Sequence, residues 1–429
     1  MITHHNPLGY LFVDMNGFFA SCEQQMRPEL RGQPVGVVPM MTETTCCIAA
    51  SYEAKKFGIK TGTGVAEARR LCPHMRFVEA RPELYVRLHH KIVAAVESCL
   101  HVDHVMSIDE MMCRLIGDHR REETARGIAL EIKAALRRDL GEVLTCSIGI
   151  APNRMLAKMA SDMQKPDGLT VIKSEELPAR LFKLELQDFP GVGPRMEKRF
   201  HRWGVTTVEQ MSNLTVDQLN RVWESKMMGR AWWHKLRGDD VPDPPTTRRS
   251  VGHSHVLPPD LRNNDDARAV LICMTHKAAA RLRRLDYWAQ SLSIDISYMY
   301  SPTGYWHDRR RIMPARDTHS ITSHDAEMWD RRPEGKPLKV GVVLGDLVPA
   351  RSATRPLFDE NLDEQLVSDA MDRINQKLGD HAVYLASMHG AQPHDPLRIA
   401  FTQIPEARRM YEMRGALDRA VGAGERRGA

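Results

Sequence analysis

The chain has 429 residues, which exceeds what one compact core normally takes and predicts roughly two to four domains. Hydrophobic residues make up 42% of it, and the eight cysteines include no CxxC pair, so a zinc ribbon or a secreted disulfide framework is excluded. Lysine and arginine outnumber aspartate and glutamate by 60 to 55, an excess that permits a polyanionic partner without requiring one.

A mixed α/β arrangement is predicted from the start of the chain to about residue 175. The apolar run at residues 10–13 is typical of a strand buried on both faces, and a helical pattern opens after it at Asn16 or Gly17. Short strands are also predicted at 35–38, 47–50, 104–108 and 145–150, with helices near 83–99 and 121–138.

The pattern of apolar and polar residues changes after this region. Residues 176–238 have little β signal and contain two short helical patterns around a Pro-Gly-Val-Gly-Pro turn, and residues 239–245 read as a stiff linker. A second α/β region is predicted from Arg248, ending in a polar and loosely ordered tail. Its expected strands lie near 249–257, 291–300 and 339–345, and its expected helices near 265–284 and 361–378.

No basic segment followed by an apolar run opens the chain, and no apolar stretch approaches the ~18 residues that span a bilayer. We therefore expect a reduced, cytoplasmic protein with no membrane partner. Cys46 and Cys47 are adjacent, which is poor geometry for a disulfide.

Acidic residues follow two of the predicted strands. Asp14 ends the first, where ligand chemistry gathers in open α/β sheets, and Asp109 and Glu110 end another. Neighbours on a strand point to opposite faces, so this pair can share a site only near a strand end or a distortion. Divalent cations would relieve the repulsion of three converging carboxylates. Taken one at a time, each acid is better explained as a helix cap or a solvated loop residue.

Five ordered blocks of the sequence change that balance. Residues 14–23 (DMNGFFASCE) and 107–110 (SIDE) resemble the two acidic motifs of Y-family DNA polymerases, closest to their DNA polymerase IV branch. The other blocks, at 51–58, 147–168 and 249–253 with 398–401, are similar to the family's triphosphate-binding helix, its last palm motif and the two ends of its little-finger domain. The resemblance spans roughly residues 8–404.

The resemblance implies a multidomain α/β (α+β) fold of the right-hand polymerase type. Its implied parts are a palm at 1–24 and 80–176, fingers at 25–79, a helical thumb with a helix-hairpin-helix at 177–238, a linker at 239–247, a little finger at 248–405 and a flexible tail at 406–429.

The resemblance also assigns roles at the active site. Asp14, Asp109 and Glu110, with the Met15 carbonyl, would hold two Mg²⁺ ions, for which Mn²⁺ can substitute. Such ion pairs clamp the attacking and leaving oxygens of phosphoryl transfer. The residues implied to face the incoming dNTP are Phe18, Phe19, Tyr52, Lys55 and Lys165.

Phe19 matches the steric gate, a rigid aromatic that leaves no room for a 2′-hydroxyl. Without the motifs, Phe18 and Phe19 would be taken as core residues, because they share helical spacing with apolar neighbours. Lys55 and Lys165 would likewise be taken as exposed lysines.

The sequence departs from the family pattern in three places. Lys55 stands where relatives usually have arginine, which exchanges a bidentate phosphate contact for a point charge. Gly17 replaces a larger residue, and Met111 with Met112 replaces a small-then-aromatic pair. None of these changes removes an implied metal ligand.

DNA would be held through its phosphates. Gly191 and Gly193, followed by Arg195 and Lys198, are similar to a helix-hairpin-helix, although an ordinary turn between helices is the alternative. At the entrance of the second α/β region, the expected DNA contacts are Arg248 and Arg249. Two further basic clusters, which also fit solvated faces, are Lys277 with Arg281 and Arg284, and Arg309–Arg311.

These features predict a low-fidelity, DNA-directed DNA polymerase for translesion synthesis, acting on primer-template DNA as a monomer. A non-catalytic polymerase-like adaptor is the main alternative, and another palm-domain enzyme such as a cyclase is a second. The tail carries no convincing clamp-binding peptide, so contact with a sliding clamp or another recruiting protein stays open.

Overall fold

The structure is a computed structural model that describes residues 7–242, 247–299, 304–353, 362–379 and 382–386. The chain divides between Pro245 and Thr246 into two compact units, and each is described here by itself. Among the described residues, no helix combines the length and the apolar content that crossing a lipid bilayer requires. The predicted block at 398–401 and the tail at 406–429 lie outside the described residues.

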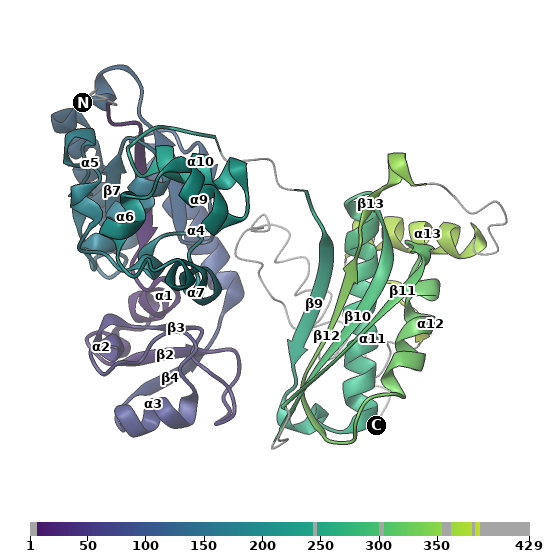
Figure 1. Ribbon diagram of the computed structural model, residues 1–429. Helices are drawn as coiled ribbons and strands as arrows, with labels where there is room; N and C mark the ends of the chain where they lie inside the picture. Colours follow the sequence, from purple (N-terminus) through teal and green to yellow (C-terminus); the bar gives the residue numbers. More distant parts are fainter. Residues whose placement is uncertain (1–6, 243–246, 300–303, 354–361, 380–381, 387–429) are drawn as a thin grey trace. The chain divides into compact units, whose positions relative to one another are not determined.

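The first unit alternates strands and helices before it becomes wholly helical (Figure 1). Its strands are β1 (Tyr10–Met15), β2 (Val35–Val38), β3 (Ala49–Ala50), β4 (Arg76–Glu79), β5 (His104–Val105), β6 (Glu110–Arg114), β7 (Cys146–Ala151) and β8 (Leu169–Val171). Its α-helices are α1 (Phe18–Met26), α2 (Tyr52–Lys55), α3 (Val65–Leu71), α4 (Pro82–Glu97), α5 (Glu122–Leu140), α6 (Arg154–Met163), α7 (Pro194–Arg202), α8 (Val208–Ser212), α9 (Val216–Trp223) and α10 (Lys226–Lys235).

The central sheet has the strand order β5-β6-β1-β7-β8. Strand β1 lies in the middle, pairs antiparallel with β6 and β7, and is buried along all six residues. This burial explains why residues 10–13 are continuously apolar instead of alternating, and it confirms the strand predicted there.

Helix α6 packs closely against this sheet because β7 carries a glycine. A Cβ atom on Gly149 would lie 2.0 Å from the carbonyl oxygen of Ala157, so no other residue fits there without moving the helix. Asn153 caps the start of the helix, and its side chain accepts a hydrogen bond of 2.9 Å from the backbone of Leu156. The side chains of α6 are therefore held at a fixed height above β1 and β7.

A smaller sheet, β3-β2-β4, follows α1 and is covered by α2 and α3. Helix α2 starts at Ser51, whose hydroxyl accepts from the backbone of Ala54 at 3.3 Å and donates to the carbonyl of Gln33 at 3.2 Å. The cap ties α2 to the segment before β2, which fixes where Tyr52 and Lys55 project.

The segment after β8 contains four helices, α7 to α10, where the sequence pattern indicated two. The missed helices have recognisable starts, because Thr207 with Gln210 and Thr215 with Gln218 form capping boxes. Apolar residues of all four helices join one core with α6 and the central sheet, among them Phe200 of α7, Met211 of α8, Val222 of α9 and Trp232 of α10.

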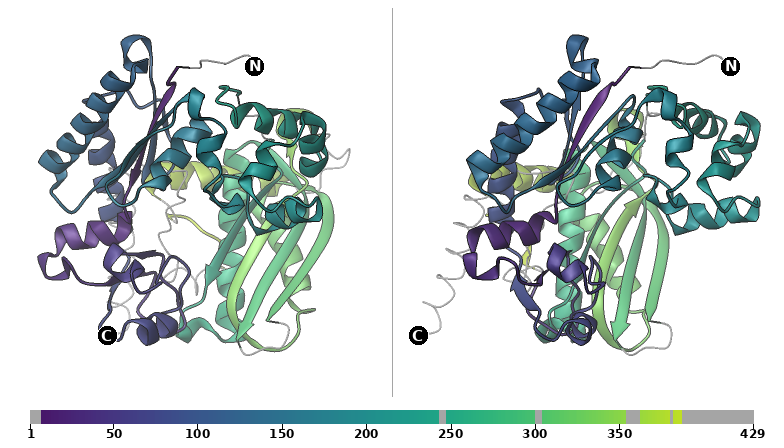
Figure 2. Two further views of the ribbon diagram at one scale, coloured as in Figure 1. Left: turned by 60° about the vertical axis from the view of Figure 1, so that its left-hand side comes forward. Right: turned by 90° about the vertical axis from the view of Figure 1, so that its left-hand side faces the viewer.

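The second unit is a four-stranded antiparallel sheet, β11-β10-β12-β9, with helices α11 and α12 packed on one face (Figures 1 and 2). Strand β11 was not predicted because exposed polar residues alternate along it, and Arg309 and Arg311 point away from Arg310, which pairs with Glu327 of α12. The strands and α-helices of the second unit are β9 (Ser250–Val256), α11 (Asn264–Arg284), β10 (Tyr287–Met299), β11 (Tyr305–Ala315), α12 (Thr318–Trp329), β12 (Lys336–Gly345), β13 (Val348–Pro349) and α13 (Leu362–Leu378).

Candidate active site

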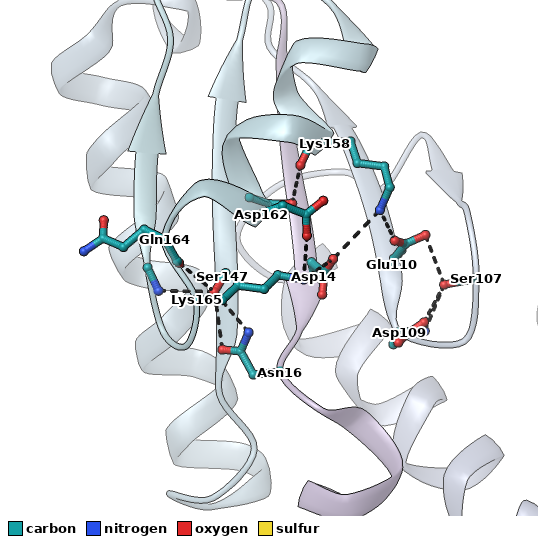
Figure 3. Close-up of polar contacts among 12 residues, drawn as sticks. Asp14, Asn16, Ser107, Asp109, Glu110, Ser147, Lys158, Asp162, Gln164 and Lys165 are labelled. Atoms are coloured by element: carbon teal, nitrogen blue, oxygen red, sulfur yellow. Dashed lines mark hydrogen bonds and ion pairs between the residues drawn. The ribbon is translucent and has the colours of Figure 1, made fainter. Parts of the chain in front are cut away.

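The three predicted acids meet at one end of the central sheet (Figure 3). The register of β1 against β6 places Asp14 directly opposite Glu110. The backbone N–H of Met15 donates a hydrogen bond of 2.9 Å to the carbonyl oxygen of Asp109. Pairing of two strands that are distant in the sequence therefore brings the acids together.

The acidic pair lies where a turn leads into β6, and not at the end of the predicted strand. The sequence indicated a strand at 104–108, but β5 ends at Val105 and β6 begins at Glu110. Between them the Ser107 hydroxyl donates to Asp109 Oδ1 at 2.6 Å and lies 3.3 Å from Glu110 Oε2. One hydroxyl reaches both carboxylates, so the turn directs the two neighbours to the same side.

Two lysines approach these acids from α6 and the loop after it. Lys158 Nζ contacts Glu110 Oε1 and lies 4.0 Å from Asp14 Oδ2. Lys165 Nζ lies 2.8 Å from Asp14 Oδ2 and 2.8 Å from Asp162 Oδ1. The site thus contains its own positive charges.

Burial shapes the electrostatics of the site. It raises the pKa of Asp14 to about 6, although the Lys165 ammonium favours the charged carboxylate. Burial also raises the pKa of Asp109, while the Ser107 hydroxyl acts in the opposite direction. Burial acts against the charge of Lys158 and Lys165, but their carboxylate partners outweigh it and raise the pKa of both lysines.

The raised pKa of Asp14 predicts a pH dependence of stability without divalent ions. Between about pH 4 and pH 6 the folded chain holds a proton that the unfolded chain has released, so the free energy of unfolding falls as pH rises. The expected fall is about 2–3 kcal/mol at most for Asp14. Denaturation in EDTA at several pH values, compared with Asp14→Asn, measures it. Equal slopes for both proteins would contradict the prediction.

The donor set suits a hard divalent cation, since carboxylate oxygens are the ligands such ions prefer. Within the described ranges, however, no group of three or more His, Cys, Asp or Glu side chains forms a ready-made cluster for a metal ion. In this structure Lys158 and Lys165 engage oxygens of Glu110 and Asp14. A metal ion at these acids would have to replace an ammonium group.

The residues predicted to bind the triphosphate lie near Asp14. Lys55 Nζ lies 4.1 Å from the centroid of the Tyr52 ring. Partial burial and the positive charge of Lys165 lower the pKa of Lys55. Burial raises the pKa of Tyr52, which keeps its hydroxyl a neutral donor. The structure therefore brings Tyr52, Lys55 and Lys165 within electrostatic range of one another and of Asp14.

Asn16 connects these elements, and the sequence assigned it no role. The residue is 2% exposed, and its Oδ1 accepts 2.8 Å from the backbone N–H of Asp167, in the loop that carries Lys165. Its Nδ2 donates to Ser147 Oγ at 3.0 Å and lies 3.5 Å from the Tyr52 hydroxyl. One buried amide thus fixes the loop of Lys165 relative to β7 and α2.

Replacing Asn16 by alanine is expected to raise the KM for the incoming nucleotide about tenfold, because the loop of Lys165 loses its anchor. The backbone N–H of Asp167 would also lose its acceptor, at about 1 kcal/mol of stability. Steady-state kinetics and thermal unfolding measure the two effects, with exposed Asn213→Ala as control. Lower stability with an unchanged KM would mean that Asn16 only supports the fold.

Phe18 and Phe19 are both buried, at 3% and 8% exposed. The Phe19 ring stacks on Tyr85, with centroids 4.4 Å apart and planes 19° from parallel. The Tyr85 hydroxyl donates to Glu23 Oε1 at 2.9 Å, and Arg81 forms two hydrogen bonds to the same carboxylate, at 3.0 and 2.6 Å. Phe19 therefore has a rigid support.

The departures at Gly17 and at the methionine pair fit the fold. Gly17 has φ 55°, a left-handed conformation, and its Cβ would lie 3.3 Å from the carbonyl oxygen of Ala50. Glycine therefore suits the entrance of α1. Met111 and Met112 are buried in β6 as core residues.

The predicted DNA contacts belong to both units of the chain. Gly193 precedes α7 and Gly191 has φ 97°, while Arg195 and Lys198 are exposed on α7. In the second unit, Arg248 and Arg249 are exposed just before β9. Burial lowers the pKa of Arg281, and the charges of Arg248 and Arg284 lower it further. These three basic residues of the second unit therefore lie near one another.

Sequence reasoning missed the roles of Asn16, Ser107 and Lys158. Each lies inside a motif block, but a neutral amide, a serine and a helical lysine carry no signal of their own. The contacts of Asn16 and Lys158 connect segments far apart in the chain, which no local pattern reveals, whereas those of Ser107 are local.

Comparison with known proteins identifies the family. Residues 13–162 match the impB/mucB/samB family, residues 248–357 its C-terminal domain, and residues 187–240 the DNA polymerase-iota thumb domain. DNA polymerase IV of Moorella thermoacetica is 33% identical over 395 residues, 89% of this chain and 96% of the relative. DNA polymerase IV of Pelotomaculum thermopropionicum is 30% identical over 386 residues, which are 88% of this chain and 94% of that relative. The chain belongs to the Y-family of DNA polymerases, on the DNA polymerase IV branch.

Solved structures agree on the fold of this Y-family chain. A Y-family DNA polymerase chimera of Dbh and Dpo4 has a TM-score of 0.63 at 22% identity, over 80% of this chain and 99% of the chimera. The insertion ternary complex of Dbh DNA polymerase has a TM-score of 0.50 at the same identity and coverage. The predicted polymerase fold class is confirmed.

Membership of the Y-family confirms the predicted function, which is DNA-directed DNA synthesis past damaged templates. The alternative of a non-catalytic polymerase-like adaptor is not favoured. Dependence on a divalent metal follows from the family.

Proposed function

We propose that Asp14, Asp109 and Glu110, with the Met15 carbonyl, bind two Mg²⁺ ions and direct nucleotidyl transfer from a dNTP to a primer 3′-end. Pyrophosphate leaves, and synthesis passes damaged templates with low fidelity. The observation that carries the proposal is the meeting of three carboxylates at one end of the central sheet, with Asp14 opposite Glu110. Bound Mg²⁺ would supply charge stabilisation for the attacking and leaving oxygens, and Mn²⁺ suits the same ligands.

The residues around the acids bind and orient the nucleotide. Lys165 and Lys55 present two cations to the triphosphate, and Tyr52 donates a hydrogen bond to it. Asn16 keeps the loop of Lys165 aligned with Tyr52. Phosphoryl transfer depends mainly on such positioning and charge neutralisation, so no further acid or base is required.

The aromatic pair at the start of α1 meets the sugar. Phe19, supported by Tyr85, excludes a 2′-hydroxyl as the steric gate, and Phe18 packs beside it at the nucleotide pocket. Phe19 would favour deoxynucleotides opposite every template base, because it contacts the sugar of the incoming nucleotide and not the base.

The division into parts is also a proposal. Residues 1–24 and 80–176 form the palm, 25–79 the fingers, 177–238 the thumb, 239–247 a linker and 248–405 the little finger. Primer-template DNA is held through its phosphates by backbone N–H groups near Gly191 and Gly193 and by basic side chains. These side chains are Arg195, Lys198, Arg248 and Arg249.

Primer extension by the purified chain tests the proposal. Undamaged and lesion-containing templates are supplied with dNTPs and either MgCl₂ or EDTA. We expect extension in MgCl₂ on both templates and none in EDTA. Absence of Mg²⁺-dependent extension would favour the adaptor alternative.

A salt series of DNA binding separates the polymerase from a palm-domain cyclase. For a polymerase that binds DNA phosphates, the logarithm of the binding constant falls steeply and linearly with the logarithm of the salt concentration, whereas a cyclase has no steep slope. A cytoplasmic location, a monomeric state and contact with a sliding clamp stay predictions.

A further inference from the structure

Lys158 lies among the acids of the proposed metal site but takes part in none of the steps above. Its Nζ hydrogen-bonds to Glu110 Oε1 and lies 4.0 Å from Asp14 Oδ2. Figure 3 shows the ammonium reaching these two carboxylates from α6. It therefore bridges the two acids that the strand register places opposite each other.

The fold holds this ammonium in place. Helix α6 cannot move toward or away from β7 without disturbing the contact at Gly149. The Nζ atom also lies 5.1 Å from the centroid of the Phe12 ring, and the side chain is only 28% exposed. A surface lysine of the ordinary kind would be mostly solvated and free to rotate.

The charges in the site explain why such a cation is needed. Asp14, Asp109 and Glu110 would repel one another without a counter-charge in their partly buried position. Lys165 contacts Asp14 and Asp162, so Glu110 depends on Lys158 and the Ser107 hydroxyl. The contacts of Lys158 use one oxygen of Glu110 that an ion would otherwise bind.

We propose that Lys158 is a built-in counter-cation of the metal site. It neutralises Glu110 and Asp14 while the site holds no divalent ion, and it competes with the ion for Glu110. Lys158 thereby sets the ion concentration at which the enzyme becomes loaded. The inference rests on the proposed function, in which these acids bind divalent ions.

Direct ion binding tests this role without any turnover. Mn²⁺ is titrated into the full chain without DNA or nucleotide, and free Mn²⁺ is followed by its paramagnetic resonance signal. We expect Lys158→Met to bind Mn²⁺ about tenfold more tightly than the wild type, because no ammonium opposes the ion. Lys158→Arg keeps the charge and should bind within about twofold of the wild type. Exposed Lys60→Met is the matched control.

Thermal unfolding gives a second measurement. In EDTA, Lys158→Met should unfold at a lower temperature than the wild type, and saturating Mn²⁺ should raise its unfolding temperature by more. Wild-type or weaker Mn²⁺ affinity in Lys158→Met would overturn the proposal. If that variant fails to fold, Lys158→Gln is judged by the same criterion.

Asp14→Asn separates this inference from the function beneath it. If the wild type shows no saturable Mn²⁺ binding that Asp14→Asn weakens, the proposed metal site itself is wrong. If that binding is present but both neutral variants at Lys158 leave it unchanged, only the counter-cation role is wrong.

Discussion

Replacing Asp14 by asparagine is expected to slow nucleotide addition by about three to four orders of magnitude, or about 4–6 kcal/mol of transition-state stabilisation. Asparagine keeps the shape of the side chain but loses the charge that a divalent ion needs. Single-turnover primer extension in saturating MgCl₂ and dNTP measures the rate, so that weaker nucleotide binding does not obscure the chemical step.

The same variant reports on folding. Because Asp14 is buried and burial raises its pKa, the neutral amide should leave the chain folded and at least as stable at neutral pH without ions. Asp118→Asn, at an exposed position of the same unit, should extend primers at the wild-type rate. A rate for Asp14→Asn within tenfold of the wild type would refute a metal-binding role for this acid.

Replacing Phe19 by alanine is expected to raise ribonucleotide incorporation, relative to deoxynucleotide incorporation, by about 100-fold or more. The ring is stacked on Tyr85, which is itself held by Glu23, so the wild-type gate cannot rotate away from a 2′-hydroxyl. The measurement is the ratio of kcat/KM for matched ribonucleotide and deoxynucleotide triphosphates on one template.

Phe57→Ala removes an aromatic ring of the same unit that is 42% exposed, and it should leave this ratio unchanged. An unaltered ratio in Phe19→Ala would show that another residue selects the sugar and that Phe19 belongs to the core. A general loss of both activities with the ratio preserved would lead to the same conclusion.

Local pattern carried much of the fold. The apolar run at β1 and the helical periods of α4, α5 and α11 are properties of neighbouring residues, so they can be recognised without the structure. Elements with an atypical pattern were missed or misplaced. Charged residues alternate along β11, and the expected strand before the acidic pair ends three residues early, at Val105.

The sequence by itself determined that Asp14, Asp109 and Glu110 match the two acidic motifs of one polymerase family, because the residue types and their order along the chain agree with those motifs. Only the tertiary structure decided how these residues are arranged in space. The register of β1 against β6 aligns Asp14 with Glu110, and close packing of α6 on β7 aims Lys158 at both. Strand pairing and helix packing join residues far apart in the chain, and their energies depend on partners that no local window contains.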